Sequence, residues 1–596
     1  MIKRLEIIDV KAVFFCSLFV FFVSCKKEPV YDEVTAFTQL EQYFKTEIRN
    51  TYESLDALNK AQLLSEKKAM YLEARLHFKK VEPILAFVDS ENYNYLNQPN
   101  ILKIEEEDFT DIKIKNPTGF QVMEELLFDE VVDEVELHTQ AAITSTRLKF
   151  LYKNQTLKFL KKHHILWMLR DAVNRIALTG ITGFDSPVLE HSLTEAQTVY
   201  ASLKEILHVF EKEFTNKELL KKWDTHLDKS VSFLANSDFK GFNRYRFLKD
   251  YTQPTLEIWN QTVSDWKVVF PFKQAINYNV DNLFSNKTFN INYFTNQKGD
   301  PIAEAKVALG KKLFEDNSLS HDKSISCATC HKQELYFTDG LAKSPGTTRN
   351  SPTLFYAALQ KGFFHDKRTG TLEGQVIDVI NNPNEFHLSL NDLEKRVMEN
   401  PSYQEAFLAT YGKAIDNHLI RNAIASYVMA LNPFNSKFDL NMQGLENTLT
   451  SSEINGFNLF TGKAKCATCH FAPLFNGLVP TAFKESEMEL IGVPQSKDTI
   501  KAKIDSDLGR YNVYQTEQRK FFFKTPTVRN IEKTAPYMHN GVYTTLEEVI
   551  DFYDKGGAAG LGIDLEYQTL PTDKLNLSAQ EKADLVAFLK SLTDKI

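Results

Sequence analysis

Cysteine is scarce in this chain of 596 residues: there are six, four of them in two identical CATCH motifs and the others at Cys16 and Cys25. Tryptophan is scarcer still, with four residues that all precede position 270, namely Trp167, Trp223, Trp259 and Trp266. The net charge is −8 and there is no long basic run, which argues against nucleic acid as a partner. No apolar run after the opening segment is long enough to span a bilayer.

The opening segment has the pattern of an export signal. Lys3, Arg4 and Lys11 precede the apolar run VFFCSLFVFFV, as in a secretory signal peptide. The run ends in FVSC, which resembles a bacterial lipobox with Phe22 where Leu is usual. We therefore expect cleavage after residue 24 and lipid on Cys25, which anchors the protein on the periplasmic side of a bacterial membrane, the outer membrane being favoured. An uncleaved membrane helix is the alternative, for which the run is short.

The pentapeptide CATCH occurs twice, and C-x-x-C-H is the attachment signal for c-type haem. Two thiols bind the porphyrin, and the histidine that follows becomes an axial iron ligand. The motifs predict covalent attachment through Cys327, Cys330, Cys466 and Cys469, with His331 and His470 as axial ligands. A redox dithiol, a zinc site and two disulfides are the competing interpretations. Neither a dithiol nor a disulfide requires the histidine that follows each pair.

Helical patterns surround both motifs and dominate the first half of the chain. A segment with helical spacing of apolar residues precedes each motif, EAKVALGKKLFED before the first and SSEINGFNLFTGKAK before the second. The last segment, LSAQEKADLVAFLKSLTDKI, opens with a capping box from Ser578 to Glu581. Residues 34–92 and 120–235 carry apolar residues at helical spacing. We predict a mainly α protein, an N-terminal helical bundle followed by two cytochrome c-like all-α haem domains. The expected parts are a signal peptide (1–24), the bundle (25–285), the first haem domain (286–440) and the second (441–596).

From about residue 300 onward the sequence resembles the bacterial di-haem cytochrome c peroxidase family, which includes the MauG enzymes that modify protein tryptophans. The resemblance rests on LGKKLFEDNSLSHDKSISCATCHKQELYFTDG, RNSPTLFYAALQKGFFHDKRTGTLEGQVIDVINNPNEF, DLGRY and FFKTPTVRNIEKTAPYMHNGVYTTLEEVIDFYDKGG. It implies a peroxidatic haem in the first domain, an electron-transfer haem in the second, and a calcium ion between them.

The resemblance also implies the groups that handle peroxide. Family members hold a Gln and a Glu ten positions apart over the first haem, and LEGQVIDVINNPNEF supplies Gln375 and Glu385 at that spacing. Glu385 is expected to move a proton between the two peroxide oxygens, and Gln375 to position peroxide. Val379 stands where the family often has Pro, which affects loop geometry only. The expected reaction is reduction of hydrogen peroxide to water, with electrons passing from the second haem to the first.

The resemblance leaves alternatives open for the second axial ligand of each haem iron. Some relatives close the resting first haem with a distal His after the motif, but no His lies between His331 and Arg349, so we expect an open or water-bound iron. His365 and His387 are the remaining candidates. The sixth ligand of the second haem is expected to be Tyr553, with Met538 as the alternative.

The family resemblance has two further implications. Many relatives have FWDGR between the haems, with the Trp as an electron relay, whereas this chain has FFHDKR with His365 at that place. Transfer between the haems is then direct or uses His365 or nearby aromatics. For calcium, the family points to the Asn350 side chain and to carbonyls around Lys524 and Pro526.

The bundle resembles imelysin-like periplasmic proteins in ARLHFKKVEPIL and NPTGFQVMEELLF, but their GxHxxE motif is here Gly119, Gln121 and Glu124. We interpret Gln121 and Glu124 as structural, and the bundle as a docking element for a donor or a partner lipoprotein. The expected donor is a small cytochrome c, a cupredoxin or a quinol-linked protein, and a homodimer is possible. Two alternative functions stay open: an electron-transfer cytochrome without peroxide turnover, and MauG-like oxidation of a protein substrate.

Overall fold

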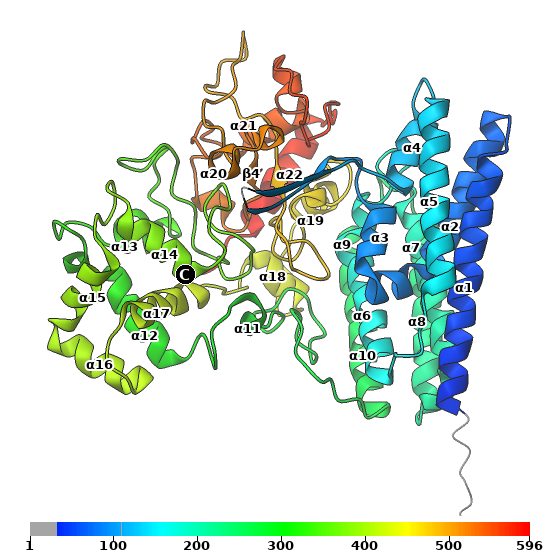
Figure 1. Ribbon diagram of the computed structural model, residues 1–596, viewed down its shortest axis with the longest axis horizontal. Coiled ribbons are helices and arrows are strands. Elements are labelled where there is room, and N and C mark those ends of the chain that lie inside the picture. The colour runs from blue at the N-terminus through cyan, green and yellow to red at the C-terminus, as the bar shows by residue number, and fades with distance from the viewer. Residues whose placement is uncertain (1–31, 109) are drawn as a thin grey trace, which may run out of the picture.

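The computed structural model describes residues 32–108 and 110–596, so the predicted signal segment and Cys25 lie outside the described residues. Within that range the chain is largely helical (Figure 1). Its longer helices are α1 (Asp32–Leu58), α2 (Leu64–Val88), α3 (Ser90–Asn97), α4 (Phe120–Phe128), α5 (Glu134–Asn154), α6 (Lys162–Leu178), α7 (Ser192–Val209), α8 (Lys217–Ala235), α10 (Gln253–Asp265), α12 (Glu304–Glu315), α14 (Leu372–Asn381), α15 (Leu390–Met398), α16 (Pro401–Tyr411), α17 (Asn417–Met429), α18 (Lys437–Met442), α19 (Ser451–Phe460), α21 (Leu546–Asp554) and α22 (Ala579–Ser591).

Short elements complete the described fold. Four-residue helices are α9 (Arg244–Phe247), α11 (Ile291–Phe294), α13 (Cys327–Cys330) and α20 (Tyr511–Tyr514), and the strands are β1 (Lys103–Asp108), β2 (Asp111–Lys115), β3 (Met488–Glu489) and β4 (Phe523–Lys524). None of the described helices combines the length and the apolar character needed to cross a membrane.

The helices α1 to α10 form the N-terminal bundle, seen on the right of Figure 1. α1 packs along α2 and α5, and α7 packs against both α2 and α8. On α2 the side chains of Tyr71, Ala74, Phe78, Val81 and Leu85 are buried, at the three- and four-residue spacing that places them on one face. This face builds the core of the bundle, as the apolar pattern predicted.

The two predicted haem regions repeat one helix pair. α12 crosses α17 in the first region, and α19 crosses α22 in the second. At each crossing a glycine is required, because a Cβ on Gly310 would lie 1.9 Å from the carbonyl oxygen of Ala423, and one on Gly456 would lie 1.9 Å from that of Asp584. The same close approach before each CATCH motif indicates two related units, which confirms the predicted fold class.

Capping side chains fix the ends of these helices. Ser578 starts α22 with the predicted capping box, and its hydroxyl accepts a hydrogen bond from the Glu581 amide while that glutamate accepts one from the Ser578 amide. The apolar residues of this last segment, Leu585, Val586, Leu589 and Leu592, are all buried and pack into the core of the second region.

The bundle packs mainly on the second haem region. The backbone N–H of Tyr245 donates to Asn458 on α19 at 3.0 Å, and the Tyr245 ring lies 6.4 Å from that of Phe457. Phe184 of the bundle meets Phe471, the residue after the second CATCH, at 5.9 Å. One hydrophobic core runs through the bundle and both haem regions.

The β1–β2 hairpin is an antiparallel pair, with Lys103 opposite Lys115 and Asp108 opposite Asp111. In Figure 1 it extends from the bundle across the second haem region. Its Glu106 carboxylate accepts a hydrogen bond from Arg510 Nε at 2.8 Å, and its Ile104 carbonyl accepts one from Arg519 at 2.9 Å. The hairpin therefore joins the bundle to the second region through polar contacts.

Candidate di-haem site

Both CATCH motifs line one continuous cavity of about 2240 Å³. Ordinary ligand pockets reach roughly 1,000 Å³, so this cavity has room for two large groups. Its walls come from both haem regions, with the bundle closing one edge through residues 97–106 and 182–188. The four cysteines of the motifs are unpaired thiols. Neither pair is therefore joined by a disulfide in this structure.

The first motif is positioned by α13, which is one helical turn long and places His331 at its C-cap. The Nδ1 of His331 donates to the carbonyl of Phe337 at 2.9 Å, and the Ser351 hydroxyl lies 3.2 Å from the same nitrogen. Burial lowers the pKa of His331, so its imidazole is neutral. A carbonyl on Nδ1 fixes the tautomer and leaves Nε2 free to bind a metal.

The second motif presents the same thiols and imidazole, but its backbone forms a 3-10 turn in place of an α-helical turn. Its cysteines lie on or just after a 3-10 turn (Cys466–Thr468), and Nδ1 of His470 donates to the Pro526 carbonyl at 3.0 Å. Burial lowers the pKa of His470 to about 4. The neutral imidazole of His470 therefore has its Nε2 available for a metal, next to the free thiols of Cys466 and Cys469.

These residues fit two covalently bound haems. A c-type haem needs two thiols, a neutral axial imidazole with its other nitrogen held, and a large enclosed space. Each motif supplies the first two, and the shared cavity supplies the third. Within the described residues no cluster of three or more His, Cys, Asp or Glu is arranged to hold a metal ion, so a zinc site built from the cysteines is not supported.

Gln375 and Glu385 both line the cavity that the two motifs share. Gln375 lies on α14, and Glu385 lies in the loop that follows, where its backbone N–H donates to Asn382 at 3.0 Å. Burial raises the pKa of Glu385, and the positive charge of Arg368 partly offsets that rise. The carboxylate in turn contributes to the raised pKa of Cys327, whose main cause is burial. Glu385 is thus a carboxyl with a shifted pKa next to the first haem site.

Tyr553 and Met538 also line the cavity, so the structure brings both candidate sixth ligands into it. Tyr553 lies near the end of α21, where burial raises its pKa, and its phenol is close enough to Cys466 and Cys469 to interact with them electrostatically. Met538 has a positive φ of 70°, and its carbonyl accepts a hydrogen bond from the Asn350 amide at 2.7 Å. The electrostatic coupling to both cysteines places the Tyr553 phenol beside the second motif.

His365 lines the cavity, and its side chain is partly buried. Its Nε2 lies 3.3 Å from the Asn350 carbonyl, and burial followed by the charge of Arg349 lowers its pKa to about 3. Phe523 of β4 and His539 come close to it from other segments of the chain, and their rings stack at 3.8 Å. His387, by contrast, is exposed, and its ring lies 5.2 Å from that of His321.

The three predicted calcium ligands lie along the wall of the cavity. The Asn350 amide donates to the carbonyls of Pro536 at 3.1 Å and Met538 at 2.7 Å. The carbonyl of Pro526 accepts from His470, and the side chain of Lys524 contacts Gln360. The structure therefore gives these groups protein partners, and calcium at this place stays a prediction.

A comparison with known proteins decides the family. Residues 304–447 match the family model of the di-haem cytochrome c peroxidases. The methylamine utilization protein MauG of Methylorubrum extorquens is 32% identical over 302 residues, which is 50% of this chain and 80% of MauG. The chain belongs to the di-haem cytochrome c peroxidase family. This membership confirms the family that the sequence motifs indicated, the peroxidase class of enzyme and the two c-type haems.

A second curated relative matches to a similar extent. Cytochrome c551 peroxidase of Nitrosomonas europaea is 33% identical over 295 residues, covering 48% of this chain and 79% of that protein. A crystal structure of a MauG-like protein associated with microbial copper homeostasis is 32% identical, with a TM-score of 0.44, and covers 50% of this chain and 91% of its own.

Two glutamates beside the second motif were not predicted from the sequence. Glu487 and Glu489 line the cavity, and burial raises the pKa of both, that of Glu487 to about 7. Arg519, which binds the hairpin, lies close enough to lower both pKa values in part. These residues lack a local motif, so their only signal is the three-dimensional contact.

Gln121 and Glu124, the bundle residues that we interpret as structural, belong to a buried polar network. Oε1 of Glu124 accepts hydrogen bonds from the Ser186 hydroxyl at 3.1 Å and from the backbone N–H of Val188 at 2.9 Å. Gln121 donates to the Asn97 carbonyl at 3.1 Å.

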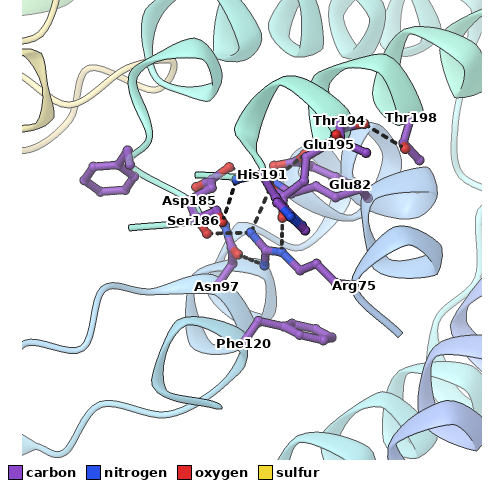
Figure 2. A network of polar contacts seen from close by, with 12 residues as sticks. Arg75, Glu82, Asn97, Phe120, Asp185, Ser186, His191, Thr194, Glu195 and Thr198 are labelled. Carbon is purple, nitrogen blue, oxygen red and sulfur yellow. Dashed lines mark hydrogen bonds and ion pairs between the residues drawn. The ribbon is translucent and has the colours of Figure 1, made fainter. Parts of the chain in front are cut away.

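Arg75 is the centre of this network (Figure 2). It donates through Nε to Glu195 at 2.5 Å and through an Nη to the Asp185 carbonyl at 2.8 Å. The Lys79 ammonium lies 2.6 Å from Asp185, 3.1 Å from Glu82 and 3.2 Å from Glu195. Two cations, Lys79 and Arg75, therefore share these three carboxylates, which is consistent with a structural role for this part of the bundle.

Proposed function

We propose that the protein reduces hydrogen peroxide to water with two electrons from an external donor, which enter at the His470 haem and pass to the His331 haem. The observation that carries this proposal is the position of Glu385, which lines the cavity and lies close enough to Cys327 and Cys330 of the first motif to raise their pKa values, with Gln375 lining the same cavity. An electron carrier requires no acid–base residue at this place. Haem iron with an open coordination position supplies peroxide binding and the electrons that cleave the O–O bond.

The proton is handled by the chain itself. Glu385 accepts a proton from one peroxide oxygen and returns it to the other, which then leaves as water. Its raised pKa suits this role, because a general acid–base works best when its pKa lies nearer the working pH. Gln375 orients peroxide by hydrogen bonding. The Phe337 carbonyl holds the His331 ring in the orientation that directs Nε2 at the metal.

Three features refine the proposal. No His follows the first motif before Arg349, which supports a first iron that is open or water-bound when oxidised. Tyr553 is our candidate for the sixth ligand at the second iron, because its phenol couples to Cys466 and Cys469. Calcium near Asn350 remains part of the proposal on the family's pattern alone.

Partners and location follow from the same proposal. The donor is a small cytochrome c, a cupredoxin or a quinol-linked protein, and it must approach the second haem region beside the bundle that packs there. The protein acts in the bacterial envelope, held by lipid on Cys25. Assembly as a homodimer also stays a proposal.

The test uses the full-length protein with both haems bound and a reduced small cytochrome as the electron donor. Glu385→Gln should lower peroxide-dependent donor oxidation by roughly 10²- to 10⁴-fold, because the proton relay is lost, while haem content is unchanged. Glu373→Gln is the matched control: Glu373 lies on α14, accepts a hydrogen bond from Gln297 at 2.8 Å and is not among the cavity-lining residues. Undiminished turnover in Glu385→Gln would contradict the proposal.

A further inference from the structure

A tyrosine lies between the two predicted haem sites with its hydroxyl aimed at a carboxylate. Tyr356 is fully buried and lines the shared cavity. Its backbone has a positive φ of 60°, which is rare for a bulky residue and is held by a hydrogen bond from its N–H to the Leu431 carbonyl at 2.8 Å. Strain of this kind persists where the surrounding structure enforces it, commonly at functional sites.

The direction of the Tyr356 proton follows from its neighbours. The backbone N–H of Phe434 donates to the phenolic oxygen at 3.0 Å, and Arg529 Nη1 donates to it at 3.4 Å. The oxygen therefore accepts from two donors, and its own single proton is given to Asp594 Oδ2 at 2.8 Å.

Asp594 is suited to take that proton. It lies near the C-terminus, which Figure 1 places beside the first haem region although α22 belongs to the second. Its other side-chain contacts are donors, the Asn530 amide at 2.9 Å and the backbone N–H of Asn435 at 3.1 Å. Burial raises the pKa of Asp594, which makes its carboxylate a stronger base, and burial raises the pKa of Tyr356 so that the phenol holds its proton at rest.

Aromatic contacts connect Tyr356 to the first site. The Phe337 carbonyl binds Nδ1 of His331, the Phe337 ring lies 5.1 Å from that of Phe355, and Phe355 lies 6.4 Å from Tyr356. Each step is a direct contact between neighbouring groups. Tyr356 is the one member of this series with a readily oxidised phenol.

Contacts on the other side lead to the second site. The Arg529 guanidinium lies 4.8 Å from the centre of the Tyr356 ring and 5.5 Å from that of Phe475. Phe475 lies 5.8 Å from Phe460, whose ring lies 6.4 Å from that of His470. Tyr356 thus stands part-way along a continuous series of contacts between the two axial histidines.

We propose that Tyr356 is a redox relay between the two haem sites, giving one electron to the oxidised first site and its phenolic proton to Asp594. The O–H bond of Tyr356 breaks and a neutral tyrosyl radical remains. An electron from the second haem then reduces the radical, and the proton returns from Asp594. The oxidant is peroxide acting at the first site, so this inference rests on the proposed function.

His365, the alternative relay, is less suited to losing an electron and a proton. His365 is partly buried, and loss of hydration together with the nearby charge of Arg349 lowers its pKa, so the surroundings resist a positive charge on the ring. Its nearest polar partner on Nε2 is a backbone carbonyl, which accepts a hydrogen bond but is not a base strong enough to take a proton. Tyr356 has a carboxylate for that purpose.

The experiment is electron paramagnetic resonance of the loaded, fully ferric protein, frozen milliseconds after addition of hydrogen peroxide. We expect a tyrosyl radical whose spectrum narrows when ring-deuterated tyrosine is incorporated. Tyr356→Phe keeps the ring packing and should lower the signal at least tenfold. Asp594→Asn keeps a hydrogen-bond acceptor but removes the base, and should lower the signal and abolish the solvent deuterium isotope effect on its formation.

Tyr427→Phe is the matched control, because the Tyr427 ring packs against Phe337 at 6.5 Å and Phe314 at 5.1 Å near the same haem site. It should leave the signal within twofold of the wild type. A radical that survives Tyr356→Phe, or that is lost in Tyr427→Phe, overturns the proposal.

A second oxidant separates this inference from the proposed function. Flash-quench photo-oxidation with a ruthenium sensitiser oxidises the haem protein without peroxide. A Tyr356-dependent radical after the flash, with no reaction to peroxide, would support the relay and contradict the peroxidase. Peroxide consumption with no tyrosyl radical by either route would contradict the relay and leave the peroxidase.

Discussion

Arg529 and Asp439 form an ion pair that is closed to solvent on both sides, with 2.8 Å between Nη2 of the arginine and Oδ1 of the aspartate. Asp439 lies on α18, and Arg529 also donates to the Pro473 carbonyl, three residues after His470. The pair therefore holds the second CATCH loop against the helix that links the two haem regions.

Removing one partner of this pair should be costly. Asp439→Asn leaves the Arg529 charge buried without a counter-charge, and we expect a loss of about 3–5 kcal/mol in the free energy of unfolding. Urea unfolding of the loaded protein, followed by circular dichroism, measures it. The control is Glu218→Gln in the exposed pair with Lys221, which should unfold like the wild type. Equal stability of all three proteins would contradict the role given to the Arg529–Asp439 pair.

The pH dependence of peroxide turnover should follow Glu385. Because burial raises the pKa of this carboxyl, the carboxylate that accepts the peroxide proton is lost as the pH falls through a value above that of an ordinary glutamate. Arg368→Gln removes a positive charge that lowers this pKa, so the acid limb of kcat/KM should move to higher pH.

The control for that shift is Arg396→Gln, which removes a positive charge from α15, where the guanidinium donates to the His321 carbonyl at 3.0 Å. Its acid limb should coincide with that of the wild type. If the acid limb of kcat/KM lies at the same pH in the wild type and both variants, the titrating group is not Glu385.

The second haem should report its sixth ligand through its spectrum and potential. Tyr553→Phe removes the phenol, so the ferric spectrum should change and the reduction potential of that haem should rise, because a phenolate stabilises ferric iron. Met538→Leu should change neither. Optical redox titration of both variants measures the two properties, and the opposite pattern would assign the ligand to Met538.

We expect Glu124 to stabilise the bundle through its hydrogen bonds and not to bind a metal ion. Glu124→Gln weakens hydrogen bonds from the Ser186 hydroxyl and the Val188 N–H, and we expect a loss of about 1–3 kcal/mol in stability. The metal content by mass spectrometry should stay at two irons per chain. Loss of an additional metal in the variant would instead make this carboxylate a ligand.

The haem sites could be predicted from the sequence because their chemistry is local. Two thiols and an imidazole within five residues identify the attachment point, and the helical patterns around them identify the fold. Glu385 and Gln375 could be assigned only through the family's spacing, since a glutamate in an Asn- and Pro-rich loop has no distinctive local pattern.

The remaining features depend on contacts between distant residues. Tyr356 and Asp594 are 238 positions apart, and Glu106 and Arg510 are 404 positions apart. Neither pair has a local signal, because a tyrosine next to Phe355 and a glutamate on a hairpin are ordinary in their own segments. Only the packing of the bundle and the C-terminus against the haem regions brings them together.

The most direct test of the account is the visible spectrum of the loaded protein after stoichiometric hydrogen peroxide is added, first to the fully ferric form and then to the half-reduced form. The open first site predicts that the ferric form reacts at once, with no prior reduction of the second haem. A reaction of the half-reduced form alone would show that a ligand closes the first iron at rest. No reaction in either form would contradict the peroxidase and leave an electron-transfer cytochrome.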